Sequence, residues 1–537
     1  MQADSKRKHA IQWIGFFAGP LMALVALLTL PSEYDTRVSQ PEANVAQQQL
    51  ESPDASQPAE NLEDTKSEFS WSGRATLAVM VWMGIWWLSE AIHISETALL
   101  PLILFPLLGA TDIKEAAFPY ANHLIFLYLG GFIIALSMEK WGLGKRIALL
   151  TLKLIGTSAP NMIAGFMIVT AILSAFVSNT ATTAMMLPIA ISTVALLRSQ
   201  LEDSPDNETK INQFGTCLLL AIAYSASVGG IMTIIGTPTN AFLIGYLRDT
   251  ISSEYQMDFS FAGWLPIGGA LVVAFLPIMY VVLTYFLFPI RGIELRGGAQ
   301  MINNELRKLG AVKQGEWNTL FVFCLAIVLW LARPLLTAIE FSWGDSQLKP
   351  LGGLTDTGIA MCAAMLLYTI PANLRKREFT MDWETTNRMP WGILILFGGG
   401  LSLAAAIKAN GVAEFLGSFA SRFGSLPTVL VILLVTAAIV FLTELTSNVA
   451  TTTSLVPVLA ALAPGVGIHP YLLIIPATVA ASCAFMLPVA TPPNAIVFGS
   501  GEITLPQMLR AGIVLNILSI FIVTLLAILV VGPWLGV

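Results

Sequence analysis

Charged side chains are scarce in this sequence. Only 12% of its 537 residues are Asp, Glu, Lys or Arg, whereas 55% are hydrophobic and the mean hydropathy is +0.73. Soluble globular domains contain about 25% charged residues. Because so few charges cannot cover the surface of so long a chain, the composition excludes a soluble protein and predicts an all-α protein that crosses the membrane several times.

Cysteine and histidine are also rare, with four of each. The cysteines lie in apolar runs without a CxxC pair, so they indicate small core residues rather than disulfides or metal ligands. No HExxH, GxSxG or Walker sequence occurs, which argues against an enzyme and against an organic cofactor. The net charge of −6 gives no reason to expect a nucleic-acid partner.

Long apolar runs are what the sequence has instead. Eleven of them predict membrane spans, at residues 11–30, 74–92, 94–109, 120–138, 214–247, 264–290, 316–340, 357–371, 391–408, 470–500 and 511–533.

The N-terminal run follows Lys6, Arg7 and Lys8. A signal peptide is the alternative, but about 20 apolar residues suit a full span better than an h-region, and no small-residue cleavage site follows. We expect residues 1–30 to be a retained transmembrane helix. Residues 31–72 form a polar insert that has little to bury.

Lysine and arginine predict the orientation, because they are enriched in cytoplasmic loops. The insert contains few of them, which places it outside, whereas two later loops are rich in them. A cytoplasmic N-terminus and eleven spans satisfy these assignments and leave the C-terminus outside. The cytoplasmic loops are identified by Arg291, Arg296, Arg307, Lys308 and Lys313, and by Arg375, Lys376, Arg377 and Arg388.

The sequence also repeats itself. L-G-G-F and S-A-F-V-S-N-T-A-T-T in the first half correspond to G-G-G-L and T-E-L-T-S-N-V-A-T-T in the second, both offset by 269 residues. Further on, G-T-P-T-N (236–240) corresponds to A-T-P-P-N (490–494). The predicted orientation makes these inverted repeats, 73–290 and 316–537, joined by a cytoplasmic linker, 291–315. Such repeats are frequent in secondary transporters, and some channels share them.

Two runs, 160–197 and 427–463, are too long for one span and carry Ser-Asn at their centres. Serine and asparagine favour turns and helix caps, so we expect re-entrant hairpins, the first entering from the inside and the second from the outside. Prolines after Thr237 and Thr491 break two further runs. Four such breaks predict a central binding site, although Ser/Thr-rich kinked helices are the alternative for any one of them.

Around these breaks Glu444 is the one residue with a formal charge. An anion with two charges would therefore be stabilised only by hydroxyls, amides, backbone dipoles and bound cations. Cation coupling is thus a physical expectation for a dianionic substrate. Glu444 itself has two open roles, as a protonated or hydrogen-bonded structural acid or as a group that tunes a cation site.

Together these motifs resemble the divalent anion/sodium symporters, a family that includes dicarboxylate, citrate and sulfate carriers. The resemblance covers most of the chain after residue 73, and it rests on the doubled Ser-Asn motif and on A-S-C-A-F-M-L-P-V-A-T-P-P-N-A-I-V (481–497). It implies one sodium site at Ser174, Ser178, Asn179 and Gly236, and a second at Thr443, Ser447, Asn448 and Ala490.

The resemblance further implies that substrate is bound by Ser178, Asn179, Thr180, Thr237, Ser447, Asn448, Val449, Thr491 and Pro492. Val449 replaces the threonine that is usual in the second motif, which bears on substrate preference.

The implied function is sodium-coupled uptake of small divalent anions, above all C4-dicarboxylates such as succinate, malate and fumarate, across the cell membrane. A homodimer and an elevator motion of a transport domain are implied as well. The alternatives are dicarboxylate exchange, sodium-coupled transport of citrate or sulfate, and a channel with the same repeats.

Overall fold

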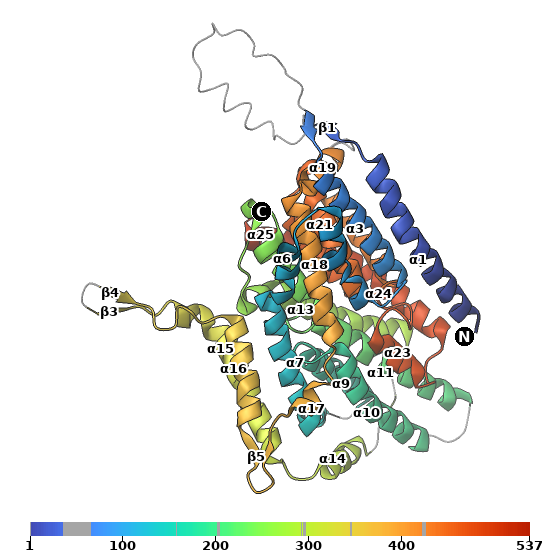
Figure 1. The fold of residues 1–537 in the computed structure, drawn as a ribbon. Coiled ribbons are helices and arrows are strands. Elements are labelled where there is room, and N and C mark those ends of the chain that lie inside the picture. The colour runs from blue at the N-terminus through green and yellow to red at the C-terminus, as the bar shows by residue number, and fades with distance from the viewer. Residues whose placement is uncertain are drawn as a thin grey trace.

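The computed structural model describes residues 2–35, 66–156, 158–200, 205–290, 293, 297–343, 346–420 and 426–536. Most of the polar insert expected at 31–72 lies outside the described residues, as does part of the linker at 291–315. Helices make up nearly all of the regular structure (Figure 1). The expectation of an all-α membrane protein is therefore confirmed.

The first half of the chain forms helices of very different lengths. They are α1 (Gln2–Thr29), α3 (Trp71–Ser89), α4 (Ile94–Thr97), α5 (Leu100–Leu108), α6 (Ile113–Ala117), η1 (Phe118–Ala121), α7 (His123–Trp141), α8 (Leu143–Ile155), α9 (Ala159–Ser174), α10 (Asn179–Gln200), α11 (Pro205–Gly230), α12 (Pro238–Gly245), η2 (Tyr246–Thr250), η3 (Ser253–Tyr255), α13 (Phe261–Val281), η4 (Val282–Leu287) and α14 (Gly298–Leu309).

The second half follows a similar order. Its helices are α15 (Gln314–Thr337), α16 (Asp356–Thr369), α17 (Trp383–Thr386), α18 (Trp391–Ala409), α19 (Val412–Ala420), α20 (Thr428–Thr443), α21 (Asn448–Leu462), η6 (Pro464–Val466), α22 (Tyr471–Ala481), α23 (Pro492–Gly499), α24 (Leu505–Leu526), η7 (Ala527–Val531) and α25 (Gly532–Leu535).

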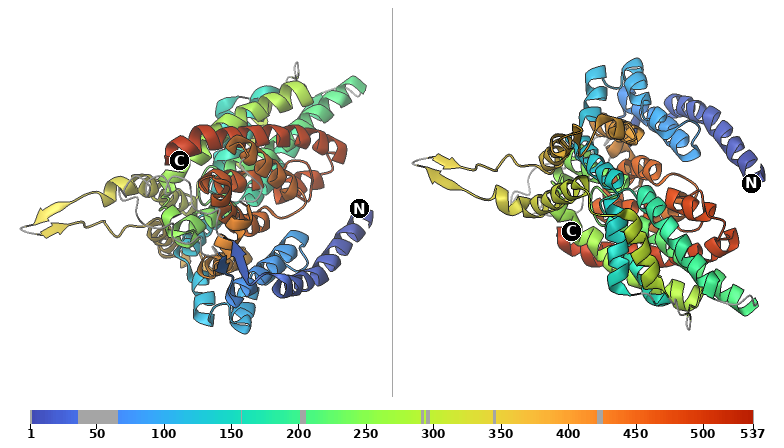
Figure 2. Two further views of the ribbon diagram at one scale, coloured as in Figure 1. Left: turned by 90° about the horizontal axis from the view of Figure 1, so that it is seen from above. Right: turned by 90° about the horizontal axis from the view of Figure 1, so that it is seen from below.

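Strands are confined, within the described residues, to three short antiparallel ribbons outside the helix bundle. One of them, β3–β4, projects well away from the body of the protein (Figures 1 and 2). The pairs are β1 (Glu33–Asp35) with β2 (Lys66–Glu68), β3 (Phe341–Trp343) with β4 (Ser346–Leu348), and β5 (Pro371–Asn373) with β6 (Glu378–Phe379).

Eight helices of the described chain are long and apolar enough to cross a membrane, and six further apolar helical segments are shorter. Each of the eleven expected spans contains a helix, but the span expected at 94–109 is not a single one. It consists of α4 and α5, which are interrupted next to Pro101. Pro101 lies in the first turn of α5, and in a continuous helix its ring would clash with the carbonyl of Thr97, four residues earlier. Since nine residues extend only about 14 Å, neither piece can span alone.

Side-chain exposure separates helices that face outward from helices that are enclosed. On α15, Trp317, Phe321 and Leu335 are all more than half exposed, so this helix presents an apolar face to its surroundings. A face of this kind fits contact with lipid. By contrast, α11 is buried along almost its whole apolar length, so neighbouring helices enclose it.

The glycine motifs of the repeat have equivalent packing roles. A Cβ atom on Gly130 of α7 would lie 2.7 Å from the backbone of Ala360 on α16. One on Gly399 of α18 would lie 2.2 Å from the carbonyl oxygen of Ala98, next to α4. Small residues let membrane helices approach closely, so the repeated glycines mark equivalent close contacts in the two halves.

Candidate functional site

Two interruptions occur in the interior of the bundle, and a proline ends each of them. Residues 231–237 separate α11 from α12, and residues 482–491 separate α22 from α23. The helices resume at Pro238 and Pro492, because proline fits the first turn of a helix but cannot continue one. These interruptions leave backbone carbonyls and helix N-termini available to ligands.

Two helix pairs turn back on themselves at the repeated Ser-Asn motif. Residues 175–178 join α9 to α10, and residues 444–447 join α20 to α21, so that α10 begins at Asn179 and α21 at Asn448. With 16, 16 and 15 residues, α9, α20 and α21 extend about 24 Å or less, which is short of a hydrocarbon core of about 30 Å. Only α10, with 22 residues, reaches that length.

At the first turn, which we call the first tip, a serine lies between two acceptors. Ser174 Oγ is 2.6 Å from Asn179 Oδ1 and 2.7 Å from the carbonyl oxygen of Ala226 on α11. A hydroxyl has a single proton and can donate to only one of them. Three oxygens therefore meet with one proton among them, which is the kind of group that a hard cation binds.

Gly236 is held against the same tip by its own loop. Thr233 Oγ1 donates a hydrogen bond to the carbonyl of Ala175, and the backbone N–H of Gly236 donates to Thr233 Oγ1 over 3.1 Å. A Cβ atom at Gly236 would lie 2.4 Å from the carbonyl oxygen of Gly230 and 2.9 Å from that of Ala175. Only glycine fits this position without displacing backbone.

The second tip has the same construction. Thr443 Oγ1 is 2.7 Å from Asn448 Oδ1 and 2.8 Å from the carbonyl oxygen of Ala481, at the end of α22. Thr443 follows Ser174 by 269 positions, and Asn448 follows Asn179 by the same number. The sequence repeat therefore produces two equivalent oxygen-rich clusters.

Glu444 distinguishes the second tip from the first. Its carboxylate accepts hydrogen bonds from the backbone N–H groups of Phe485 (2.6 Å), Met486 (2.8 Å) and Leu487 (3.0 Å), and from Asn516 Nδ2 (2.7 Å). Only 3% of the residue is exposed. Because all four neighbours are donors, they suit an ionised carboxylate, which accepts hydrogen bonds only. These contacts favour the structural role of the two that the sequence left open.

The two repeats are interleaved at the site. The helix that follows the first tip, α10, packs against α23, and the helix that follows the second tip, α21, packs against α12. Each of these helices therefore contacts the segment that follows the interruption in the other repeat. Thr239 Oγ1 lies 3.0 Å from Ser482 Oγ, and Tyr224 donates to the carbonyl of Phe485 over 2.8 Å. Thr237 is buried beside Thr239, with 3.3 Å between their hydroxyls. Figure 1 shows α9, α10, α11 and α23 gathered in one region.

Other residues predicted for the site lie at the tips or at helix starts. Ser178 Oγ accepts a hydrogen bond from the backbone N–H of Ala181 over 3.2 Å, and Ser447 is the N-cap of α21. Thr491 is buried and its hydroxyl caps the first turn of α23, and Ala490 beside it is buried too. The structure thus brings these residues to the two breaks.

Three predicted residues are placed differently. Thr180 and Pro492 are exposed in the structure. Val449 is half-buried and packs against hydrophobic residues of two core clusters. None of the three belongs to the buried hydrogen-bonded part of the site.

Sequence reasoning missed four contributors to the clusters. Ala226 and Ala481 contribute carbonyl oxygens, which no side-chain motif can reveal. Asn240 and Asn494 bind the backbone of the interrupted segments. Their signal was present in the repeated T-P-x-N sequence, which predicted the helix breaks but was not used to give the asparagines a role of their own.

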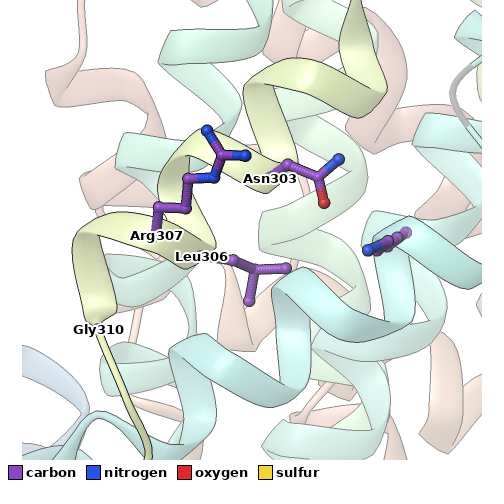
Figure 3. Close-up of a pocket in the computed structure, with 5 residues that line it drawn as sticks. Asn303, Leu306, Arg307 and Gly310 are labelled. Atoms are coloured by element: carbon purple, nitrogen blue, oxygen red, sulfur yellow. The ribbon is translucent and has the colours of Figure 1, made fainter.

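No group of three or more His, Cys, Asp or Glu side chains is close enough to hold a metal ion in the described ranges. A cavity of about 610 Å³ lies elsewhere, between α8 and α14. Asn303, Leu306, Arg307 and Gly310 line it from the α14 side (Figure 3), with Lys153 from α8. None of these was predicted for the site, so this surface cavity is separate from the two tips.

Residues 67–537 match the sequence family described as the sodium:sulfate symporter transmembrane region. The chain is 38% identical over 535 residues to the sodium-dependent dicarboxylate transporter SdcS of Staphylococcus saprophyticus, which covers 99% of this chain and 94% of that protein. It is 40% identical over 471 residues to the protein of the same name from Staphylococcus aureus (strain USA300), which covers 88% of each chain. Among solved structures, the Alcanivorax borkumensis YdaH transporter aligns with 81% of this chain and 90% of its own, with 14% identity and a TM-score of 0.46.

Proposed function

Since this chain belongs to the family of the sodium:sulfate symporter transmembrane region, we propose that it couples the entry of sodium ions to the uptake of small divalent anions, in particular C4-dicarboxylates such as succinate, malate and fumarate. The relatives named as sodium-dependent dicarboxylate transporters support both the ion and the substrate class. It is a multi-pass membrane transporter rather than an enzyme.

The two equivalent oxygen clusters carry the proposal. Each joins a hydroxyl, an asparagine amide and a backbone carbonyl, and neither contains a lysine or arginine. A dianion placed between them lacks a fixed protein cation, and burial without compensation would be strongly unfavourable. Bound sodium supplies the positive charge, which gives a physical reason for coupling.

We assign one sodium ion to each tip. The first ion is bound by Ser174, Ser178, Asn179 and Gly236, and the second by Thr443, Ser447, Asn448 and Ala490. Neutral oxygens from side chains and backbone are suitable ligands for a hard cation.

The substrate lies between the two tips in this proposal. Its carboxylates face the N-termini of α10, α21, α12 and α23, where unpaired N–H groups and the helix dipole favour anions. Ser178, Asn179, Ser447 and Asn448 lie at the first two of these N-termini, and Thr237 and Thr491 at the others. Thr180, Val449 and Pro492 adjoin them without a buried polar contact.

An elevator motion in a homodimer completes the proposal, with the N-terminus in the cytoplasm and the C-terminus outside. A cavity of about 360 Å³ lies where η2 and the end of α21 face α18 and α19. In this proposal the part that contains the tips moves relative to α18, one of the helices that line this cavity. The orientation is supported by the lysine- and arginine-rich loops.

Uptake of labelled succinate into proteoliposomes tests the function directly. Uptake should require an inward sodium gradient and fall to background when choline replaces sodium, and malate and fumarate should compete for it. Undiminished net uptake in sodium-free buffer would refute sodium coupling. Uptake only into vesicles preloaded with dicarboxylate would identify an exchanger, and stronger competition by sulfate or citrate would reassign the substrate.

A further inference from the structure

Each interrupted segment is held by a buried asparagine from the helix that follows it. Asn240 Nδ2 donates to the carbonyl oxygens of Ile231 (3.0 Å) and Thr233 (2.9 Å). In the other repeat, Asn494 Nδ2 donates to the carbonyl oxygens of two residues of the 482–491 segment, Ala484 (3.2 Å) and Leu487 (3.1 Å). Both asparagines are fully buried.

In both residues the amide NH2 group forms hydrogen bonds, whereas the amide oxygen forms none within the described part of the chain. The NH2 group donates both of its hydrogen bonds to backbone carbonyls, and these bonds fix the orientation of the amide. The Oδ1 atoms of Asn240 and Asn494 are buried and have no hydrogen-bond partner among the described residues. A buried acceptor without a partner is unfavourable, so the function of the side chain lies in its two donors.

The tethered segments are the ones that reach the tips. Thr233, whose carbonyl is bound by Asn240, also donates its hydroxyl to Ala175 in the first tip. Leu487, whose carbonyl is bound by Asn494, donates its N–H to Glu444 in the second tip. One intervening residue therefore connects each asparagine to its tip, at a residue next in sequence to Ser174 or Thr443 of the oxygen cluster.

We infer that Asn240 and Asn494 are positioning residues, one for each cation site, which hold the carbonyls of the interrupted segments in the arrangement that binds sodium. This inference rests on the sodium sites proposed above. The equivalence of the two residues in the repeat supports it, because one contact pattern occurs beside both oxygen clusters.

Asn240→Asp and Asn494→Asp test the inference, because they keep the shape of the side chain and replace its two donors by an acceptor. Thermal unfolding of the purified full-length protein in detergent is measured at increasing sodium chloride, with choline chloride keeping the ionic strength constant. Sodium that binds only the folded state stabilises it by RT ln(1 + [Na+]/Kd) at each site, so the titration yields the half-saturating concentration Kd. We expect each variant to raise that concentration by about tenfold or more.

Asn318→Asp is the matched control. Asn318 on α15 is also buried, and its Nδ2 donates to the carbonyl of Pro371 (3.1 Å) and to Thr380 Oγ1 (2.8 Å), away from both tips. It should lower the unfolding temperature with and without sodium and leave the half-saturating sodium concentration unchanged. If an aspartate variant does not fold, the alanine variant at the same position, which removes the donors without adding an acceptor, takes its place.

The outcomes separate this inference from the proposed function. A merely structural role predicts that the variants of both asparagines lose stability as Asn318→Asp does and keep a half-saturating sodium concentration within twofold of wild type. That result would overturn the inference. A wild-type protein that sodium does not stabilise would instead refute the sodium sites themselves.

Discussion

Glu444→Gln is the substitution whose effect on stability follows most directly from the structure. The carboxylate is buried and accepts four hydrogen bonds, three from consecutive backbone N–H groups of residues 485–487 and one from Asn516. Glutamine has nearly the same shape but offers one acceptor oxygen and one donor group. The substitution therefore changes hydrogen bonding while the packing around it is kept.

The magnitude follows from the geometry. Glutamine fits best with its oxygen at the position of Oε1, which keeps the bonds from Phe485, Met486 and Asn516, and its NH2 then opposes the N–H of Leu487. Each kept bond loses about 1 kcal/mol when its acceptor becomes neutral, and the N–H of Leu487, left without an acceptor, costs about 1–3 kcal/mol. Removal of a buried charge offsets several kcal/mol of this loss, so we expect a net decrease in the free energy of unfolding of about 1–3 kcal/mol.

Unfolding of the purified protein in detergent measures this effect, with Glu378→Gln at an exposed position as the control that should match wild type. Glu444→Ala leaves all four donors without an acceptor and should destabilise the protein more than Glu444→Gln does. A glutamine variant as stable as wild type, or an alanine variant more stable than the glutamine variant, would refute the reasoning and return Glu444 to a role in cation binding.

Asn179→Ala and Asn448→Ala each remove an amide oxygen from a tip and should abolish sodium-driven succinate uptake while the protein remains folded; near-normal uptake by either variant would remove that tip from the site. Val449→Thr introduces a hydroxyl beside the second tip, and inhibition constants for succinate, malate and citrate should shift relative to one another by about tenfold if the hydroxyl reaches substrate, since a hydrogen bond to a charged group contributes about 1.5–3 kcal/mol. Constants within twofold of wild type would show that residue 449 only packs. Cysteines placed within 36–65 of a cysteine-free variant should react with an impermeant thiol reagent on intact cells, whereas cysteines within 300–308 should not; the reverse pattern would invert the proposed orientation.

Local signals predicted the parts of the site that depend on local sequence. The Ser-Asn turns and the T-P-x-N breaks were readable because proline, serine and asparagine act on their own backbone. The division of 94–109 into α4 and α5 was missed, although Pro101 was visible, because hydropathy alone had been used to define that span.

Long-range contacts were not predictable in the same way. The carbonyl of Ala226 lies beside Ser174 only because α11 packs against α9, and an alanine gives no chemical signal of that role. Three of the four donors around Glu444 come from a segment 41 to 43 positions later in the chain, and Asn516 lies 72 positions later, so the sequence near Glu444 left two roles open. Only the distances to the backbone show that, among the described residues, Asn240 and Asn494 form hydrogen bonds through Nδ2 and not through Oδ1.

The interleaving of α10 with α23 and of α21 with α12 also constrains how the protein is made. When the ribosome has inserted the first half of the chain, α10 can already pack against α11, but it still lacks α23, which lies close to the end of the sequence. The surroundings of the first tip are thus incomplete until translation is nearly finished, although Ala226 and Thr233 of the same repeat already contact it. A protein truncated after the first repeat would lack α23 beside α10 and the whole of the second cluster, so two separately produced halves would have to associate within the membrane to complete the site.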